Sequence, residues 1–187
     1  MSEDVVITSM NQFILETECP FIDDFEVLFQ NKGANDSKGK FTINGYQFDT
    51  TDSIKKDFNH VTKWVEDKCR IRKIPIKNLK INMSWGIEYK DGGYQAFHCH
   101  GVDAITVVFH FDGQPRIKDA PDSTYGMLYS IMPRADGTQR LQNHIPTRGK
   151  CLIMDGKVFH GVYPVKEPRR SIVIDFDYNW LDPDEKL

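Results

Sequence analysis

Short apolar runs alternate with turn residues through the second half of the chain, a pattern typical of antiparallel β-proteins. From Leu79 onward the runs are rich in Val, Ile, Phe and Tyr, and turn sequences such as Asp91-Gly92-Gly93 and Asp155-Gly156 separate them. Many short strands at this spacing predict a sandwich or a barrel. The expected strands cover residues 80–89, 94–98, 104–111, 125–132, 150–154, 158–162 and 171–176.

The pattern of residues in the first half of the chain predicts a mixed segment of strands and one helix. Residues 5–15 indicate an early strand, and residues 31–40 are the clearest predicted loop. Residues 41–48 indicate a hairpin arm that turns near Asn44-Gly45. Residues 51–53 are N-cap candidates. Behind them one helix is expected, ending near Cys69, because four apolar residues recur at helical spacing: Ile54, Phe58, Val61 and Val65.

Together these patterns predict a single domain over residues 1–187, of the mainly β (α+β) class. An α+β segment over about residues 1–78 would support an all-β core over about residues 79–180. A chain of 187 residues is long enough to bury a hydrophobic core of its own.

Composition and charge argue against several function classes. Hydrophobic residues make up 40% and charged residues 27%, an ordinary balance for a globular protein. The net charge of −3 provides no basic field for nucleic acid, and the basic residues between Lys68 and Lys80 read as a solvated face. No apolar run approaches a membrane span, and the start is unlike a signal peptide. The four cysteines form no CxxC pair, and Cys99 and Cys151 are expected to be buried. We therefore expect a cytoplasmic protein without membrane or nucleic-acid partners, its oligomeric state left open.

The candidate chemistry begins with a pair of histidines at the end of a predicted strand. His98 and His100 are two residues apart, so their side chains point to the same face of a regular strand. With His160, which lies in a distant strand-like run, they form a reasonable ligand set for Fe, Mn, Zn or Cu. An isolated His-x-His also occurs by chance, so this prediction needs support from elsewhere. Of the other histidines, His144 is expected in a loop and His60 in solvent.

That support comes from the segment of residues 149–176. One strand brings in His160, a turn follows, and the next strand opens with Arg169-Arg170-Ser171. Adjacent strands lie about 4.8 Å apart, so an arginine at this place can reach a pocket beside the metal. Arginine binds a carboxylate through two parallel hydrogen bonds. A chelating 2-oxo acid requires a metal at one end and a cation at the other, and this segment can supply both.

These residues resemble the Fe(II)/2-oxoglutarate-dependent oxygenase superfamily, especially its compact prolyl-hydroxylase-like and phage-encoded members. The order of elements carries the resemblance: an aromatic strand, a turn glycine, a histidine pair, an apolar strand, a second histidine strand and Arg-x-Ser. The resemblance implies a double-stranded β-helix (jelly roll), an Fe(II) site, and 2-oxoglutarate and O2 as co-substrates. The implied reaction hydroxylates a C–H bond and yields succinate. The matching residues are Trp85, Tyr89, Gly93, His98, His100, Thr106–Phe111, Gly149, His160, Val162, Pro164, Arg169 and Ser171.

The chain departs from the family pattern at the third metal ligand. The family has a carboxylate two residues after the first histidine, where this chain has His100. Three alternatives follow. His100 is itself the third ligand, or Asp103 turns in with the help of Gly101, or water or substrate takes the position while His100 supports the site. His100 is favoured, then Asp103. Without a carboxylate ligand the site carries one more positive charge, which shifts the Fe(II)/Fe(III) balance.

The far carboxylate of the co-substrate has two candidate partners. Arg169 and Arg170 point to opposite faces of a regular strand. Arg169 is favoured because it matches the Arg-x-Ser spacing, which places Ser171 on the same face and lets it share the carboxylate. His110 is a further candidate, either for contact with the carboxylate or for support of the site, and its alternative role is that of a core histidine.

Two other functions stand beside the leading prediction of an Fe(II)/2-oxoglutarate dioxygenase. A cupin-like metalloenzyme without 2-oxoglutarate fits Gly92 followed by the histidine pair, but it leaves Arg169 and Ser171 unexplained. A non-catalytic β-sandwich binding module predicts histidines that hold no metal, because fold alone does not imply function. The sequence does not specify the substrate, which is expected to be a small molecule or a peptide.

Overall fold

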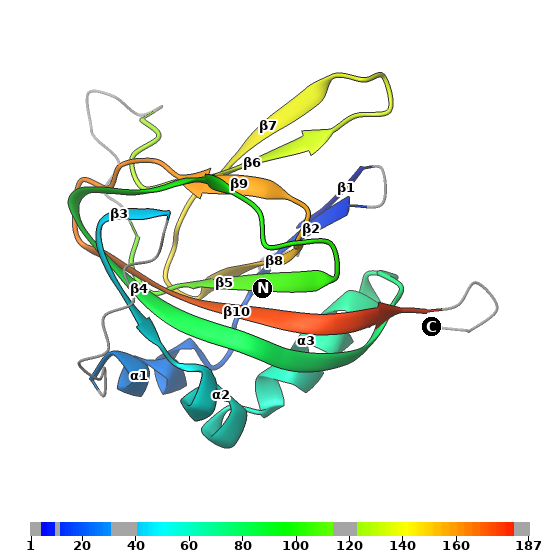
Figure 1. Cartoon of the computed structure of the whole chain (residues 1–187), viewed down its shortest axis with the longest axis horizontal. Coiled ribbons are helices and arrows are strands. Elements are labelled where there is room, and N and C mark those ends of the chain that lie inside the picture. The colour runs from blue at the N-terminus through cyan, green and yellow to red at the C-terminus, as the bar shows by residue number, and fades with distance from the viewer. Residues whose placement is uncertain (1–4, 10–11, 31–40, 114–122, 182–187) are drawn as a thin grey trace.

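The computed structural model describes residues 5–9, 12–30, 41–113 and 123–181, whose ten strands form one curled antiparallel sheet (Figure 1). The helical elements are η1 (Ile22–Phe25), α1 (Glu26–Gln30), α2 (Thr51–Asp57) and α3 (His60–Ile71). The strands are β1 (Val5–Ser9), β2 (Gln12–Glu18), β3 (Thr42–Asp49), β4 (Ile76–His98), β5 (Ala104–His110), β6 (Leu128–Pro133), β7 (Gln139–His144), β8 (Lys150–Asp155), β9 (Phe159–Val162) and β10 (Arg169–Trp180).

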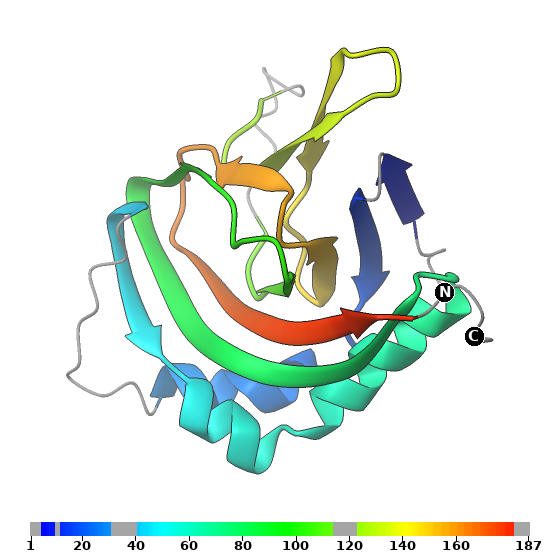
Figure 2. The ribbon, with the colours of Figure 1, turned by 45° about the vertical axis from the view of Figure 1, so that its right-hand side comes forward.

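Strand β4 determines the shape of the sheet because it takes part in both layers of the roll. The strand order is β1-β2-β8-β5-β10-β4-β9-β6-β7, with β3 also paired to β4. Early in β4, Trp85 lies opposite Val173 of β10, whereas at its end His98 lies opposite His160 of β9. Between these parts the strand curves over the roll (Figure 2) and passes through Gly92, whose φ of 74° suits glycine. This arrangement is the jelly-roll double-stranded β-helix expected from the sequence.

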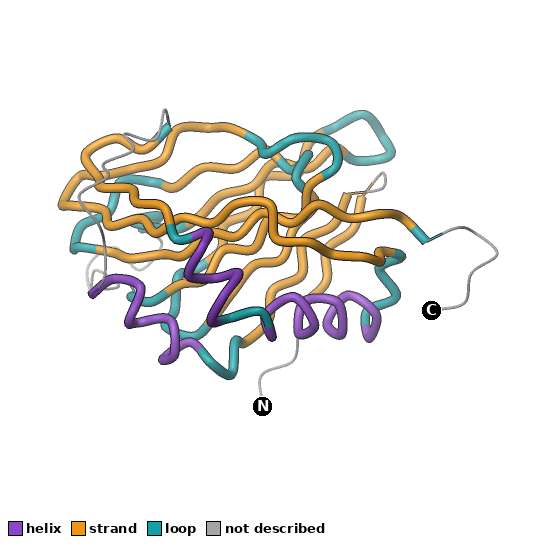
Figure 3. Tube along the Cα trace, turned by 60° about the horizontal axis from the view of Figure 1, so that its bottom comes forward, coloured by secondary structure: helices purple, strands orange, loops and turns teal. Residues whose placement is uncertain are grey.

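The outer face of the curled sheet carries a hydrophobic core that the helices close. The alternation of β10 sends Ile172, Ile174 and Phe176 to this face, where all three are fully buried. The helices lie across it (Figure 3) and contribute apolar side chains that include Ile54 and Val65. Each such side chain stabilises the fold by about 1.5–3 kcal/mol. This layer therefore holds the strands in place and leaves the inner face for other roles.

The inner face of the roll is apolar but contains several buried polar side chains. Ile87 and Val173 belong to its hydrophobic cluster, together with residues of β6, β8 and β9. His110, Arg169 and Ser171 are also buried on this side. Burial of a polar group is costly unless the group finds a hydrogen-bond partner. These side chains therefore mark the interior of the roll as the place of a candidate site.

The structure corrects two predicted turns. The sequence Asp91-Gly92-Gly93 does not end a strand, because β4 runs continuously from Ile76 to His98 and has neighbours on both sides of the bend. Asn44-Gly45 forms a register shift inside β3 rather than a hairpin turn, with Asn44 at a φ of 49°. In both places strand pairing overrides the local turn signal.

The predicted helix is divided in two. A break between Asp57 and His60 separates α2 from α3, and the N-cap is Thr50, one residue before the predicted candidates 51–53. The four apolar residues of the predicted stripe, Ile54, Phe58, Val61 and Val65, are nonetheless all buried. No helix within the described ranges is long and apolar enough to cross a membrane.

Three further expectations were wrong because long-range contacts decided them. The single strand expected at residues 5–15 is instead two strands, because β1 pairs antiparallel with β2, and β2 also pairs with β8, so the N-terminal segment is part of the roll as well as its support. His144, expected in a loop, is the buried last residue of β7. Cys99 is exposed, whereas Cys151 is buried as expected. The loop predicted at residues 31–40 lies outside the described residues.

A cluster of charged and polar side chains ties β2 to β7 and β8. Glu16 accepts hydrogen bonds from Nζ of Lys150 at 2.7 Å and from Nδ1 of His144 at 3.4 Å. The hydrogen bond from His144 is the largest cause that lowers the pKa of Glu16 to about 2, and Lys150 acts in the same direction against the effect of burial. The carboxylate thus joins the two ends of the sheet.

Glu16→Gln is expected to destabilise the protein in a pH-dependent way. Because the pKa of Glu16 falls from 4.5 to about 2 on folding, its contribution is present above pH 4.5 and is lost as the pH falls toward 2. At neutral pH the loss should be on the order of 2 kcal/mol, allowing for partial exposure. Urea unfolding of both proteins at neutral pH and at about pH 3 measures it. An equal difference at both pH values would mean that the glutamine only disturbs packing.

Candidate metal centre and adjoining pocket

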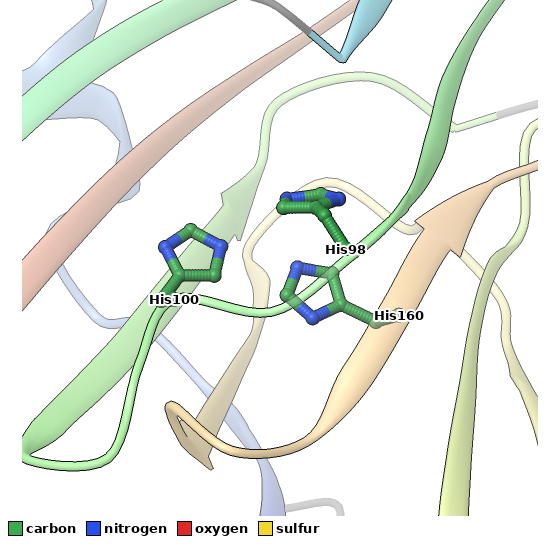
Figure 4. Close-up of side chains that lie close together, drawn as sticks. All are labelled: His98, His100 and His160. Atoms are coloured by element: carbon green, nitrogen blue, oxygen red, sulfur yellow. The ribbon is translucent and has the colours of Figure 1, made fainter.

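Three histidine rings face a common point at the end of β4 (Figure 4). His98 is the last residue of β4, His100 follows in the loop, and His160 lies in β9 directly opposite His98. A register shift in β4 just before His98 turns this side chain inward. One ligand atom from each ring lies within 4.8 Å of the others, close enough for the three rings to bind one ion.

The hydrogen bonds of the three rings leave the same nitrogen atom free. Nδ1 of His98 and Nδ1 of His160 each lie against the backbone carbonyl oxygen two residues earlier, at 2.7 Å and 3.0 Å. Nδ1 of His100 lies 2.8 Å from Oδ2 of Asp175. A carbonyl or carboxylate oxygen accepts hydrogen bonds, so each Nδ1 carries the proton. Each neutral ring therefore keeps the lone pair of Nε2 for a metal.

Burial favours the neutral form of His98 and His160. It is the largest cause that lowers the pKa of His98, and it lowers the pKa of His160 well below its usual range. The neighbouring histidines add to the shift because each would repel a second positive charge. Metal binding requires the neutral imidazole. At neutral pH the lone pairs of His98 and His160 are therefore available to a cation.

Asp175 is a residue of this site that sequence analysis missed. It lies on β10 opposite Thr106 of β5 and is 7% exposed. Its Oδ1 accepts a hydrogen bond from the Thr106 hydroxyl at 2.7 Å, while its Oδ2 faces His100. The signal in the sequence was an acidic residue inside the apolar run 171–176, where a charge is rare without a buried partner.

A narrow pocket inside the roll adjoins the histidines. Its walls include His100 and His160, and also Arg169 and Ser171 of β10. Native interiors satisfy most buried polar groups, so a cluster of unpartnered ones indicates room for a polar ligand. Five such atoms lie in or beside this pocket among the described residues: Nε1 of Trp85, Nε2 of His100, Nε2 of His110, Nε of Arg169 and Oγ of Ser171.

Arg169 places a cation deep in the pocket. Its side chain is 1% exposed, with the guanidinium 5.6 Å from the centre of the Tyr89 ring. It donates hydrogen bonds to the carbonyl oxygen of Gly126 and to Nδ1 of His110, each at 2.9 Å. Burial lowers the pKa of Arg169, yet an arginine stays charged in a protein. Within the described part of the chain it forms no ion pair with a carboxylate, so it offers its charge to an anionic ligand.

His110 is oriented by this arginine. Because Nδ1 of His110 accepts the hydrogen bond from Arg169, the proton of the neutral ring lies on Nε2, which has no partner among the described residues. Burial, followed by the charge of Arg169, lowers the pKa of His110 well below its usual range. His110 is therefore a buried neutral donor beside the pocket, which fits the predicted contact with an anion or support for the arginine.

Arg170 and Asp103 lie apart from this site. Arg170 faces the opposite side of β10 and pairs with Glu26 at 2.7 Å and with Asp112 at 2.8 Å. Asp103 is exposed and is not part of the histidine cluster. The backbone N–H groups of His100 and Gly101 donate to the carbonyl oxygen of Gly156, which holds the loop with His100 turned inward.

No family model matches the chain, and no curated protein matches it in sequence. Solved structures do match it in fold. The viral collagen prolyl hydroxylase of Paramecium Bursaria Chlorella virus-1, in complex with 2-oxoglutarate, is 14% identical, with 88% of this chain and 95% of that chain covered and a TM-score of 0.60. HygX of Streptomyces hygroscopicus, with nickel and 2-oxoglutarate bound, is 8% identical. The match covers 88% of this chain and 82% of HygX, with a TM-score of 0.62. The α-ketoglutarate-dependent epimerase SnoN of nogalamycin biosynthesis is 9% identical. The match covers 90% of this chain and 80% of SnoN, with a TM-score of 0.61. At these identities the likeness shows that the chain has the fold of 2-oxoglutarate enzymes.

Metal binding should depend on the three histidines. We expect the wild-type protein to bind one Co(II) or Fe(II) ion per chain in anaerobic titrations. His98→Ala and His160→Ala should each lower the affinity by about 100-fold or more, because only two nitrogen ligands remain. His60→Ala is a matched control, since His60 is exposed on α3 and belongs to no cluster of metal ligands in the described chain. Unchanged affinity in His160→Ala would contradict the assignment.

Proposed function

We propose that this protein is an Fe(II)- and 2-oxoglutarate-dependent dioxygenase that hydroxylates a peptide or small-molecule substrate. One observation carries the proposal: a single pocket is lined by two of the three clustered histidines, His100 and His160, and by a buried arginine without a carboxylate partner in the described chain. 2-Oxoglutarate has a metal-chelating 2-oxo acid at one end and a carboxylate at the other. It therefore matches both features of the pocket.

The residues of the pocket divide between metal and co-substrate. His98, His100 and His160 would hold Fe(II) through their Nε2 atoms, and three protein ligands leave positions open for oxygen ligands. Arg169 and Ser171 share one face of β10, and both have unpartnered polar atoms. They would bind the far carboxylate of 2-oxoglutarate by charge-assisted hydrogen bonds.

The chain supplies position and exclusion of water, while the bound groups supply the oxidation. When bound, iron, 2-oxoglutarate and O2 would supply the oxidising power: overall, 2-oxoglutarate would be converted to succinate and CO2, with one oxygen atom in succinate and the other in the new hydroxyl group of the substrate. Apolar side chains of the pocket, including Val108, Leu128 and Val173, surround the polar groups. The low local dielectric strengthens the pairing of Arg169 with a carboxylate.

Trp85 is suited to adapt the pocket to its ligand. The pocket is narrow, so a ligand as large as 2-oxoglutarate requires the side chains around it to shift. The Trp85 ring stacks on His100, with ring centroids 5.6 Å apart and an angle of 12° between the rings, and its Nε1–H has no partner in the described structure. A small movement of this ring would widen the pocket and let Nε1–H donate to an oxygen atom of the co-substrate close to the metal.

The surroundings of His98 favour a substrate with an apolar group or ring beside the reacting carbon. Phe41 stacks on the His98 ring with centroids 4.9 Å apart and remains 44% exposed. An exposed aromatic face next to a metal ligand can pack against such a group. A peptidyl or amino-acid side chain is the substrate class that we propose, and hydroxylation is the proposed reaction.

Arg169→Ala should separate co-substrate binding from metal binding. Anaerobic addition of Fe(II) and then 2-oxoglutarate to the wild-type protein is expected to produce a visible charge-transfer band. Loss of the buried cation should weaken 2-oxoglutarate binding by at least about 30-fold, while iron still binds. Arg170→Ala is the matched control, because Arg170 faces Glu26 and Asp112 on the other side of the strand.

The anaerobic titration of the wild-type protein with Fe(II) and 2-oxoglutarate also distinguishes the proposed dioxygenase from the two other candidate functions. Iron binding without a band in the wild-type protein would contradict the use of 2-oxoglutarate and favour a cupin-like metalloenzyme. Failure to bind any metal would favour a non-catalytic binding module.

Trp85→Phe tests the donor near the metal. The substitution removes the indole N–H but keeps an aromatic ring to stack on His100. We expect the Kd of 2-oxoglutarate to rise about tenfold, the value of one hydrogen bond to a charged group, with no change in Co(II) affinity when 2-oxoglutarate is absent. An unchanged Kd would show that Nε1 does not contact the co-substrate.

A further inference from the structure

The geometry points to Asp175 as a positioning residue of the metal centre, acting through His100 and supplying the negative charge that a ligating carboxylate would otherwise bring. This inference rests on the proposed function, because it assumes that the three histidines bind a metal. It concerns a residue of β10 that is 75 positions from His100 in sequence and that is not itself a member of the histidine cluster.

His100 differs from the other two histidines in what holds its Nδ1 atom. His98 and His160 donate to backbone carbonyl oxygens, whereas His100 donates to the Asp175 carboxylate at 2.8 Å. The backbone carbonyl oxygens that face His98 and His160 belong to residues two positions earlier and carry only a partial charge. The carboxylate that faces His100 carries a full negative charge and comes from a distant strand. The pair is well shielded, since the side chains of His100 and Asp175 are 6% and 10% exposed. His100, which occupies the position where the family has a carboxylate ligand, is therefore the histidine that is hydrogen-bonded to a carboxylate.

Asp175 is itself held in one orientation. Its second oxygen, Oδ1, accepts the hydrogen bond of the Thr106 hydroxyl at 2.7 Å, and strand pairing aligns Asp175 with Thr106. With both oxygens engaged, the carboxylate cannot rotate without breaking a buried hydrogen bond. Thr106 thus anchors Asp175, and Asp175 in turn fixes the proton of His100 on Nδ1.

Ring stacking fixes the plane of His100 as well. The His100 ring is nearly parallel to two neighbouring rings, at 12° to Trp85 and 8° to His160, with centroid distances of 5.6 Å and 5.1 Å. Stacking restricts the tilt of the ring, while Asp175 restricts its rotation and its tautomer. Together they leave Nε2, which has no hydrogen-bond partner in the described structure, as the atom offered to the metal.

The charge of Asp175 compensates for the absent carboxylate ligand. Three neutral imidazoles bring no charge to a divalent cation, so the site would be more positive than one with two histidines and a carboxylate. A carboxylate hydrogen-bonded to a ligand imidazole makes that imidazole a stronger donor and lies close enough to offset part of the cationic charge. The chain therefore places its negative charge one residue away from the metal instead of on it.

The tautomer of His100 is measured first, in the metal-free protein, by long-range ¹H–¹⁵N NMR correlation. In the wild type we expect the proton on Nδ1. In Asp175→Asn we expect a mixture or the proton on Nε2, because the amide can donate a hydrogen bond to Nδ1. A wild-type His100 with its proton on Nε2, or the same tautomer in both proteins, would overturn the positioning role without bearing on whether the site binds a metal.

A double-mutant cycle on Co(II) affinity then tests whether Asp175 acts through His100. Asp175→Asn should weaken Co(II) binding by about 10- to 100-fold in the wild-type background. In the His100→Asp background, where no imidazole remains to be oriented, the same change should alter the affinity by about threefold or less. An equal loss in both backgrounds would overturn the inference. Failure of the wild type to bind Co(II) would instead overturn the proposed function.

The Thr106 pair provides a second route if Asp175→Asn fails to fold, which circular dichroism would reveal. Thr106→Val removes the hydroxyl that anchors Asp175 and keeps the shape of the side chain, whereas Thr106→Ser keeps the hydroxyl. Thr106→Val should weaken Co(II) binding and Thr106→Ser should restore it to within about threefold of the wild type. Equal affinity in Thr106→Val and in the wild type would overturn the anchored arrangement.

Discussion

The continuity of β4 through its bend is the constraint on which the rest of the structure depends. Because one strand pairs first with β10 and later with β9, it draws the two layers of the sheet into a roll. The pairing with β9 sets His98 directly opposite His160, and the pairing with β10 sets Tyr89 opposite Arg169. The clustered histidines and the buried cation therefore share one interior, because they are attached to β4 or to its neighbouring strands.

The interior of the roll combines apolar walls with buried polar side chains. Its walls are apolar, yet they enclose Arg169, His110 and Ser171, each buried and each with an unpartnered polar atom in the described structure. Such groups raise the free energy of the folded chain unless a ligand satisfies them. The helix-covered outer core, which includes Ile172, Ile174 and Phe176, supplies the burial that offsets this cost.

In the proposed metal centre, a histidine takes the place that a carboxylate ligand has in the family that the sequence resembles, and the negative charge lies on Asp175 instead of on a metal ligand. His100 contributes a neutral donor, and Asp175 stands behind it on the neighbouring part of the sheet. The orientation of His100 then depends on β5 and β10 through Thr106 and Asp175. The proposed metal centre is in this way coupled to β5 and β10 in the middle of the sheet.

Much of this protein was determined by its sequence. The strand periodicity predicted the all-β core, the helical stripe predicted the buried face of α2 and α3, and the alternation of β10 put Arg169 and Ser171 on one face and Arg170 on the other. These features depend on the local geometry of the backbone, which a sequence expresses directly. The continuity of β4, the pairing of β7 and the exposure of Asp103 were decided by tertiary structure. So was the role of Asp175, because a contact between residues 75 positions apart forms only when distant strands become neighbours. Pairing between strands and burial in a shared interior are properties of the whole fold, and no local pattern encodes them.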